Sequence, residues 1–150
     1  MRDKISAALK EATLSRDALR LSTLRMVSAA IKNADIEARG QGKDPPGDDA
    51  ILAILQKLIK QRQESAELYD RGGRSELAAK ERDEIGHIQS FLPQQLGEAE
   101  IEAAISDIIE EVGATGPKDM GKVMAALKAA YPGRMDFAKA SASVKRVLGG

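Results

Sequence analysis

Apolar residues recur every three or four positions along almost the whole chain, and this periodicity leaves room for little besides helices. The longest such pattern runs from Ser15 to Arg39, with apolar positions at Leu21, Leu24, Val27, Ile31 and Ala34. Such spacing places the apolar side chains on one face of a helix. Residues that favour helices dominate the composition, and aromatic residues make up only 3% of it. We therefore predict an all-α protein.

Glycine and proline divide the first part of the chain into about four helices, two of them long. The segment Gly40–Asp48 (GQGKDPPGD) has no apolar residue and is predicted to be a loop. The expected helices lie around residues 5–12, from an N-cap at Ser15 to Arg39, from Asp48 to the glycine pair at 72–73, and from there to a stop at Pro93.

The composition changes across Pro93–Gly97, and we place a domain boundary there, between residues 1–95 and 96–150. The second domain contains three short apolar stripes, which end at Gly113, at Pro132-Gly133 and at Leu148. Asp136 suits the N-cap of the last stripe. Short amphipathic helices with tight connections predict a small three-helix bundle.

The segment Gly116–Met124 (GPKDMGKVM) looks at first like a phosphate-binding loop. Val123 follows Lys122 where such a loop needs a serine or threonine to hold magnesium. Pro117 also suits the first position of a helix, with Gly116 as its N-cap and Asp119 two residues later. The amides of Gly121 and Lys122 would then bond within the helix, so we predict a helix here instead of a nucleotide site.

This helix is predicted to bury Met120, Val123, Met124, Leu127 and Tyr131, and to turn Lys118 and Lys122 to the other side with Gly121 and Lys128 on the flank. A glycine inside a helix costs about 1 kcal/mol relative to alanine. We therefore expect the space beside Gly121 to be used. We expect either a neighbouring helix or the backbone of a closely approaching ligand, such as RNA, to occupy this space.

Formal net charge is zero, so the chain lacks the overall positive charge typical of nucleic-acid-binding proteins. The local distribution is uneven, because residues 97–112 hold six acidic and no basic residues. Residues 116–150 hold seven basic and two acidic ones, a local excess of +5. We identify Lys118, Gly121, Lys122, Lys128 and Arg134 as candidate RNA contacts. A second basic stretch in the first domain is either a solvated helix face or a further phosphate contact, and it contains Lys57, Lys60 and Arg62.

No catalytic or metal-binding constellation is apparent in the sequence. There is no cysteine, and His87 is the one histidine, too few for a typical zinc site. We expect no cofactor, no metal and no catalytic residue. Charges interrupt the N-terminal apolar residues, unlike a secretory signal, and no apolar run is long enough to cross a membrane. The lack of cysteine fits a reducing compartment, and we expect a cytoplasmic protein.

Several separate blocks of sequence resemble YqeY-like proteins of the GatB/YqeY family. These blocks are LSTLRMVSAAIKNADIE (21–37), KLIKQRQESAELYDRGGRSELAAKE (57–81), FLPQQL (91–96) and MGKVMAAL with YPGRMD (120–136). The family is similar to the tail domain of GatB, one of the proteins that make up the glutamine-dependent aspartyl/glutamyl-tRNA amidotransferase. The resemblance implies an all-helical N-terminal domain followed by a small tail-like domain of three helices.

The same resemblance implies an accessory protein that is associated with tRNA and related to glutamine-dependent tRNA amidation, without activity on its own. The family label, carbon–nitrogen ligase activity with glutamine as amido-N-donor, belongs to the whole complex. Many relatives have a small residue, Asp and Gly after the Gly-Arg pair, where this chain has Met135, Asp136 and Phe137. A contact that depends on glycine at position 137 is therefore in doubt.

Two functional hypotheses follow from the sequence. In the first, the chain binds tRNA through its basic C-terminal face. In the second, it is a helical protein–protein adaptor without RNA binding, with an amidotransferase or an aminoacyl-tRNA synthetase as its partner. An independent glutamine-dependent ligase is a third hypothesis, which only the family label supports. We expect neither DNA nor a membrane as a partner.

Overall fold

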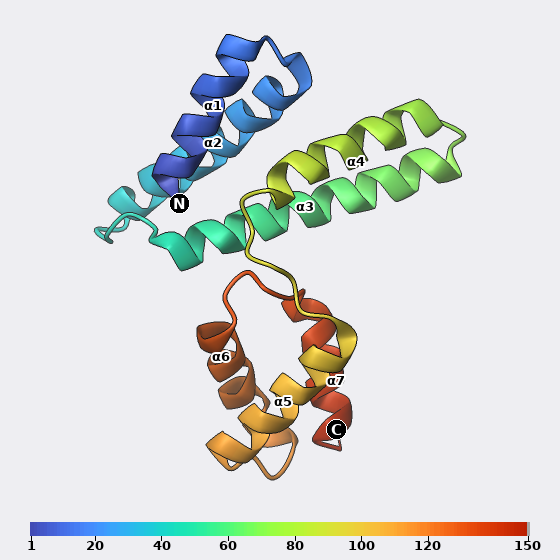
Figure 1. Cartoon of the computed structure of the whole chain (residues 1–150). Helices are drawn as coiled ribbons and strands as arrows, with labels where there is room; N and C mark the ends of the chain where they lie inside the picture. The colour runs from blue at the N-terminus through green and yellow to red at the C-terminus, as the bar shows by residue number, and fades with distance from the viewer. Residues whose placement is uncertain (150) are drawn as a thin grey trace. The chain divides into compact units, whose positions relative to one another are not determined.

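The computed structural model of the protein describes residues 1–149. These residues form seven α-helices and one short 3₁₀ helix, with no strand among them (Figure 1). The all-α prediction is confirmed. Contacts between residues divide the chain into two compact units, Met1–Leu92 and Pro93–Gly150. Each unit is described by itself.

The N-terminal unit consists of two helical hairpins, α1 (Arg2–Ser15) with α2 (Ala18–Gly40) and α3 (Asp48–Arg71) with α4 (Ser75–Gln89) (Figure 1). Helix α2 also packs against α3 and α4. The apolar stripes predicted from the sequence meet in the core between these helices. Its main cluster of buried side chains is Ile5, Val27, Ile31, Ile51, Leu55, Ile59, Ile85 and Ile88.

The start of α2 differs from the prediction. Ser15 belongs to the last turn of α1, where its hydroxyl donates to the carbonyl oxygen of Ala12 at 3.4 Å. Arg16 then adopts a left-handed conformation, with φ of 57°, which ends α1. The N-cap of α2 is Asp17, whose carboxylate accepts the backbone N–H of Arg20 at 3.2 Å. The predicted N-cap at Ser15 is therefore wrong, because an aspartate two residues later takes that position.

The C-terminal unit contains α5 (Glu98–Val112), the 3₁₀ helix η1 (Pro117–Asp119), α6 (Met120–Ala130) and α7 (Phe137–Val147). Each α-helix packs against the other two. Asp136 is the N-cap of α7, as predicted, and accepts the backbone N–H groups of Ala138 and Lys139 at 2.9 and 3.3 Å. The buried core is Ala104, Ile105, Ile108, Val123, Leu127, Met135, Ala140 and Val144.

Hydrogen bonds join residues 93–96 to the turn between α6 and α7. The backbone N–H of Leu96 donates to the carbonyl oxygen of Arg134 at 2.9 Å, and the Arg134 Nε donates back to the carbonyl oxygen of Gln94 at 3.1 Å. The side-chain amide of Gln95 donates to the carbonyl oxygen of Gly133 at 2.7 Å. The segment from Pro93 onward therefore belongs to the C-terminal unit, and the division lies three residues before the expected boundary.

Candidate nucleic-acid interface

The start of α6 is built by a short 3₁₀ turn and a side-chain cap. Gly116 has an extended backbone, and Pro117 follows as the first residue of the turn. The Asp119 carboxylate reaches back and accepts the backbone N–H of Thr115 at 2.9 Å. This bond, with further help from the Gly116 N–H and from Lys118, holds the pKa of Asp119 below its ordinary value.

The backbone groups of this segment are used within the helix start itself. The N–H of Asp119 donates to the carbonyl oxygen of Gly116 at 3.0 Å, and the N–H of Met120 donates to that of Pro117. Gly121 and Lys122 then lie in the first turn of α6. The predicted helix is confirmed, although its first turn is 3₁₀ instead of α. This geometry does not form the loop of free amides that cradles a nucleotide phosphate.

Helix α6 separates a buried face from an exposed one. Val123 and Leu127 are fully buried, and Met120 and Met124 pack against the same core. We call the opposite side of α6, together with Lys118 of the preceding η1, the lysine face of α6; its exposed residues are Lys118, Gly121, Lys122, Ala125, Lys128 and Ala129. Three exposed cations therefore stand among residues with small side chains.

Gly121 lies in open space. A Cβ atom built on it would meet no heavy atom within 4 Å, apart from its own neighbourhood in the helix. No described helix therefore occupies the space that this glycine leaves. A neighbouring helix of this chain, one of the two uses expected from the sequence, is thus not observed among the described residues.

Arg134, the fourth candidate cation of this unit, has a structural function. It is half-buried, and its Nε and its carbonyl oxygen both form hydrogen bonds with the backbone of residues 94–96. Its side chain is thus less available to a ligand than the lysines of α6.

Charge is segregated within the C-terminal unit. The six carboxylates of α5 are all exposed, and none of them forms an ion pair with any residue in the range 1–149; they are Glu98, Glu100, Glu102, Asp107, Glu110 and Glu111. The basic residues lie on the η1–α6 segment, on α7 and in the turn between them. The helix dipoles favour this distribution of charge. Acidic residues lie in the first turn of α5, and Lys145 and Arg146 lie in the last turn of α7.

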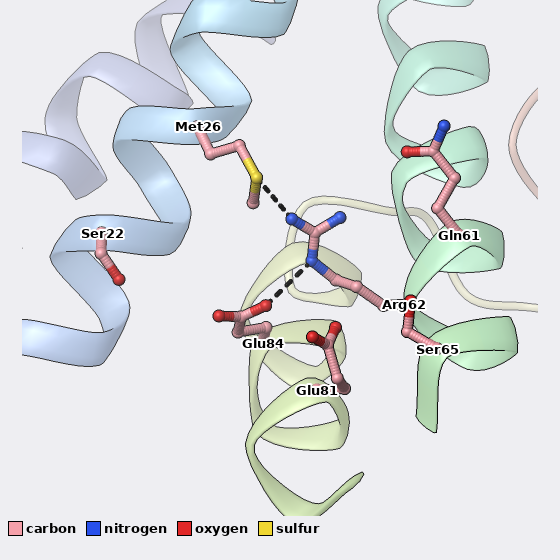
Figure 2. A pocket seen from close by; sticks show the side chains of 7 residues that line it. All are labelled: Ser22, Met26, Gln61, Arg62, Ser65, Glu81 and Glu84. Carbon is pink, nitrogen blue, oxygen red and sulfur yellow. Dashed lines mark hydrogen bonds and ion pairs between the residues drawn. The ribbon is translucent and has the colours of Figure 1, made fainter. Parts of the chain in front are cut away.

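The second basic stretch contains both exposed and buried residues in the folded chain. Lys57 and Lys60 are exposed on α3, but Arg62 is only 8% exposed. The Arg62 Nε donates to Glu84 Oε2 at 3.1 Å (Figure 2). One terminal nitrogen of Arg62 donates to the Leu58 carbonyl oxygen at 2.9 Å. Arg62 therefore does not share the exposed face on which the sequence interpretation placed it.

The sequence did contain the signal for this difference. Arg62 lies seven residues after Leu55 and four before Ala66, so it falls on the buried stripe of the same helix. Its partner Glu84 directly precedes Ile85, which belongs to the buried stripe of α4. A charged residue on an apolar stripe requires a partner, and the periodicity alone does not identify it.

His87 is half-buried on α4. Within residues 1–149, no three side chains of histidine, cysteine, aspartate or glutamate gather closely enough to hold a metal ion. In the same part of the chain, every helix is too short or too polar to traverse a lipid bilayer.

Comparison with known proteins gives three informative relatives, all named "Altered inheritance of mitochondria protein 41, mitochondrial". The protein of Lachancea thermotolerans is 36% identical over 111 residues, which cover 73% of this chain and 58% of the relative. That of Vanderwaltozyma polyspora is 34% identical, with 75% and 62% covered. That of Pyrenophora tritici-repentis is 28% identical over 149 residues, with 97% and 80% covered. The chain thus spans about three-fifths of the first two relatives.

These relatives contradict the cytoplasmic location expected from the sequence, because their names place them in mitochondria. The expectation rested on the absence of cysteine, which does not distinguish one reducing compartment from another. The family itself is shown over nearly the full length, since the model of the Yqey-like protein family matches residues 2–148. The chain belongs to the Yqey-like protein family.

Proposed function

We propose that this chain is an accessory protein associated with tRNA, whose C-terminal unit contacts the phosphate backbone through the lysine face of α6. The observation that carries the proposal is Gly121, an exposed glycine with open space above it, between exposed Lys118 and Lys122. The similarity of the family to the tail domain of a tRNA amidotransferase component supports the same kind of ligand.

The physical basis is electrostatic and steric. Lysines that meet phosphates release condensed counterions, and this makes binding strong at low salt and weak at high salt. A residue without a side chain lets a sugar–phosphate backbone come close to the helix. The small side chains of Ala125 and Ala129 extend this low surface along α6. Lys57 and Lys60 of the N-terminal unit are proposed as secondary phosphate contacts.

The proposed role is non-catalytic and related to glutamine-dependent tRNA amidation. The lysine face of α6 holds positive charge and open space, and it contains no nucleophile paired with a base. An assay for ammonia release with glutamine, ATP and charged tRNA tests this part of the proposal. Turnover by the isolated chain would contradict it.

The adaptor hypothesis has one observation in its favour, the exposed carboxylates of α5. Six acidic side chains without ion pairs among the described residues suit a basic protein surface as well as solvent. A pull-down with and without nuclease separates the two functions. Partners that disappear after nuclease treatment support tRNA association, whereas partners that persist favour the adaptor.

The direct test of the proposed function is a titration of the purified chain with tRNA at two salt concentrations. We expect binding at low salt that weakens steeply as salt increases. Absence of binding at low salt would overturn the proposal.

A further inference from the structure

A polar pocket of about 450 Å³ opens in the N-terminal unit between α2, α3 and α4. Its lining is Ser22 and Met26 from α2, Gln61, Arg62 and Ser65 from α3, and Glu81 and Glu84 from α4 (Figure 2). The volume lies within the range of pockets that hold small organic molecules. The lysine face of α6 contributes no residue to this pocket, so a ligand bound here is independent of the proposed RNA contact.

Arg62 is already neutralised on one side of the pocket. Its Nε donates to Glu84 Oε2, a terminal nitrogen donates to the Leu58 carbonyl oxygen, and another contacts the Met26 sulfur. An anion that entered the pocket would meet a guanidinium whose charge is matched by Glu84, and it would also face a second carboxylate. The pocket is therefore a poor site for an anion.

Glu81 provides the charge that is not matched. It lies one turn before Glu84 on α4, it is half-buried, and it turns toward the same pocket (Figure 2). Among residues 1–149 its carboxylate has neither a hydrogen bond nor an ion pair. One arginine and two glutamates leave the lining with a formal charge of −1, in a partly desolvated place where a cation interacts more strongly than in water.

The other lining groups suit a donor-rich ligand with an alkyl arm. The hydroxyl of Ser65, the amide oxygen of Gln61 and the second oxygen of Glu84 are further acceptors among the residues that line the pocket. The Met26 side chain offers an apolar and polarizable surface on the α2 side. A primary ammonium group has three donors and no acceptor, which matches this surplus of acceptors.

We propose that this pocket binds an alkylammonium group, with the Glu81 carboxylate as its counter-ion. The group can belong to a free amine or to a lysine side chain of a partner protein. Both sources present the same charge and the same methylene arm, and the probes below distinguish them.

The test uses the full chain with ¹³C-methyl-labelled methionine. The Met26 methyl group reports on the pocket, while Met120, Met124 and Met135 of the other unit are internal references. The probes are n-butylammonium, Nα-acetyl-lysine methylamide, and the latter compound with its side-chain amine acetylated, all at constant ionic strength. We expect the two ammonium probes to shift the Met26 signal and the acetylated probe to leave it unchanged. Tighter binding of the lysine derivative than of butylammonium identifies a protein side chain as the ligand, and the reverse order identifies a free amine.

Glu81→Gln is the decisive variant, because it removes the unmatched charge without breaking any bond within the described chain. Its affinity for the ammonium probes is expected to fall about tenfold, in line with the loss of a charge-assisted hydrogen bond. Asp83→Asn is the matched control, since it removes an exposed carboxylate of the same helix that does not line the pocket. The proposal would be overturned if the acetylated probe shifted the Met26 signal as much as the ammonium probes do. It would also be overturned if Glu81→Gln left the affinity for the ammonium probes unchanged, or if Asp83→Asn lowered that affinity as much as Glu81→Gln does.

Discussion

Arg62 and Glu84 form a largely buried ion pair that joins α3 to α4, with 3.1 Å between Nε and Oε2 and side-chain exposures of 9% and 15%. The pair lies where α2 also approaches, because Arg62 contacts the Met26 sulfur (Figure 2). Burial of two charges is tolerated only when they satisfy each other. This relationship explains why a residue in a basic stretch of sequence belongs to the core.

Arg62→Met is predicted to destabilise the N-terminal unit by about 3 kcal/mol, because it leaves the largely buried Glu84 carboxylate without its partner. The double variant Arg62→Met with Glu84→Leu should recover most of this loss, since no unpaired charge remains. Urea unfolding followed by the Met26 methyl signal in NMR measures the free energy of unfolding of this unit. Arg82→Ala, at the exposed pair between Arg82 and Asp70, is the control and should cost much less. A double variant that is no more stable than Arg62→Met would contradict this account.

The Asp119 carboxylate is predicted to make the C-terminal unit sensitive to acid. Its pKa is lowered in the folded state, chiefly by the Thr115 N–H, so the charged form is favoured by folding. The stabilisation is therefore fully present above the unfolded pKa of about 3.9 and is lost as the pH falls through the lower folded value. Urea unfolding followed by the Met124 methyl signal should show that Asp119→Asn is less stable than the unsubstituted chain at neutral pH. The difference should shrink at acid pH.

Asp107→Asn is the matched control for this effect, because Asp107 is exposed on α5 and has no bond to any residue in the described part of the chain. It should change stability little at either pH. A ¹³C titration of the Asp119 carboxyl group that gives an ordinary aspartate pKa would contradict the explanation directly.

Gly121→Ala separates stability from binding. Alanine fits at this helical position without a steric clash and should stabilise the C-terminal unit by up to about 1 kcal/mol. If a phosphate backbone lies close to Gly121, the same change should weaken the affinity for tRNA. Gly86→Ala on α4 is the matched control, because Gly86 is also an exposed helical glycine with open space around it. A gain in stability with unchanged affinity would exclude close approach at Gly121.

The helices were predictable because each apolar stripe is regular and each break carries a strong local signal. Pro117 marks the start of the segment that leads into α6, and Asp136 caps α7, as the sequence indicates. The start of α2 was mistaken because Ser15 and Asp17 both suit an N-cap. The left-handed turn at Arg16, which decides between them, has no signal in the residue type.

The candidate sites were predictable only in part. The exposed face of α6 follows from helical periodicity, since Val123 and Leu127 fix which side is buried. The environment of Arg62 did not follow, because its partner Glu84 is 22 residues away in the sequence. The pocket at Glu81 depends on the packing of three helices, which local patterns do not specify.

The measurement that tests the central claim most directly is the salt dependence of tRNA binding for a double variant of the lysine face. Lys118→Gln with Lys122→Gln should weaken binding at low salt and reduce the slope of log K against log salt by roughly 1.5, because two phosphate contacts are lost. Lys4→Gln with Lys10→Gln removes the same charge from exposed positions of α1 and should leave the slope unchanged. Equal slopes for the unsubstituted chain and both variants, or no binding of tRNA by the unsubstituted chain, would contradict the account.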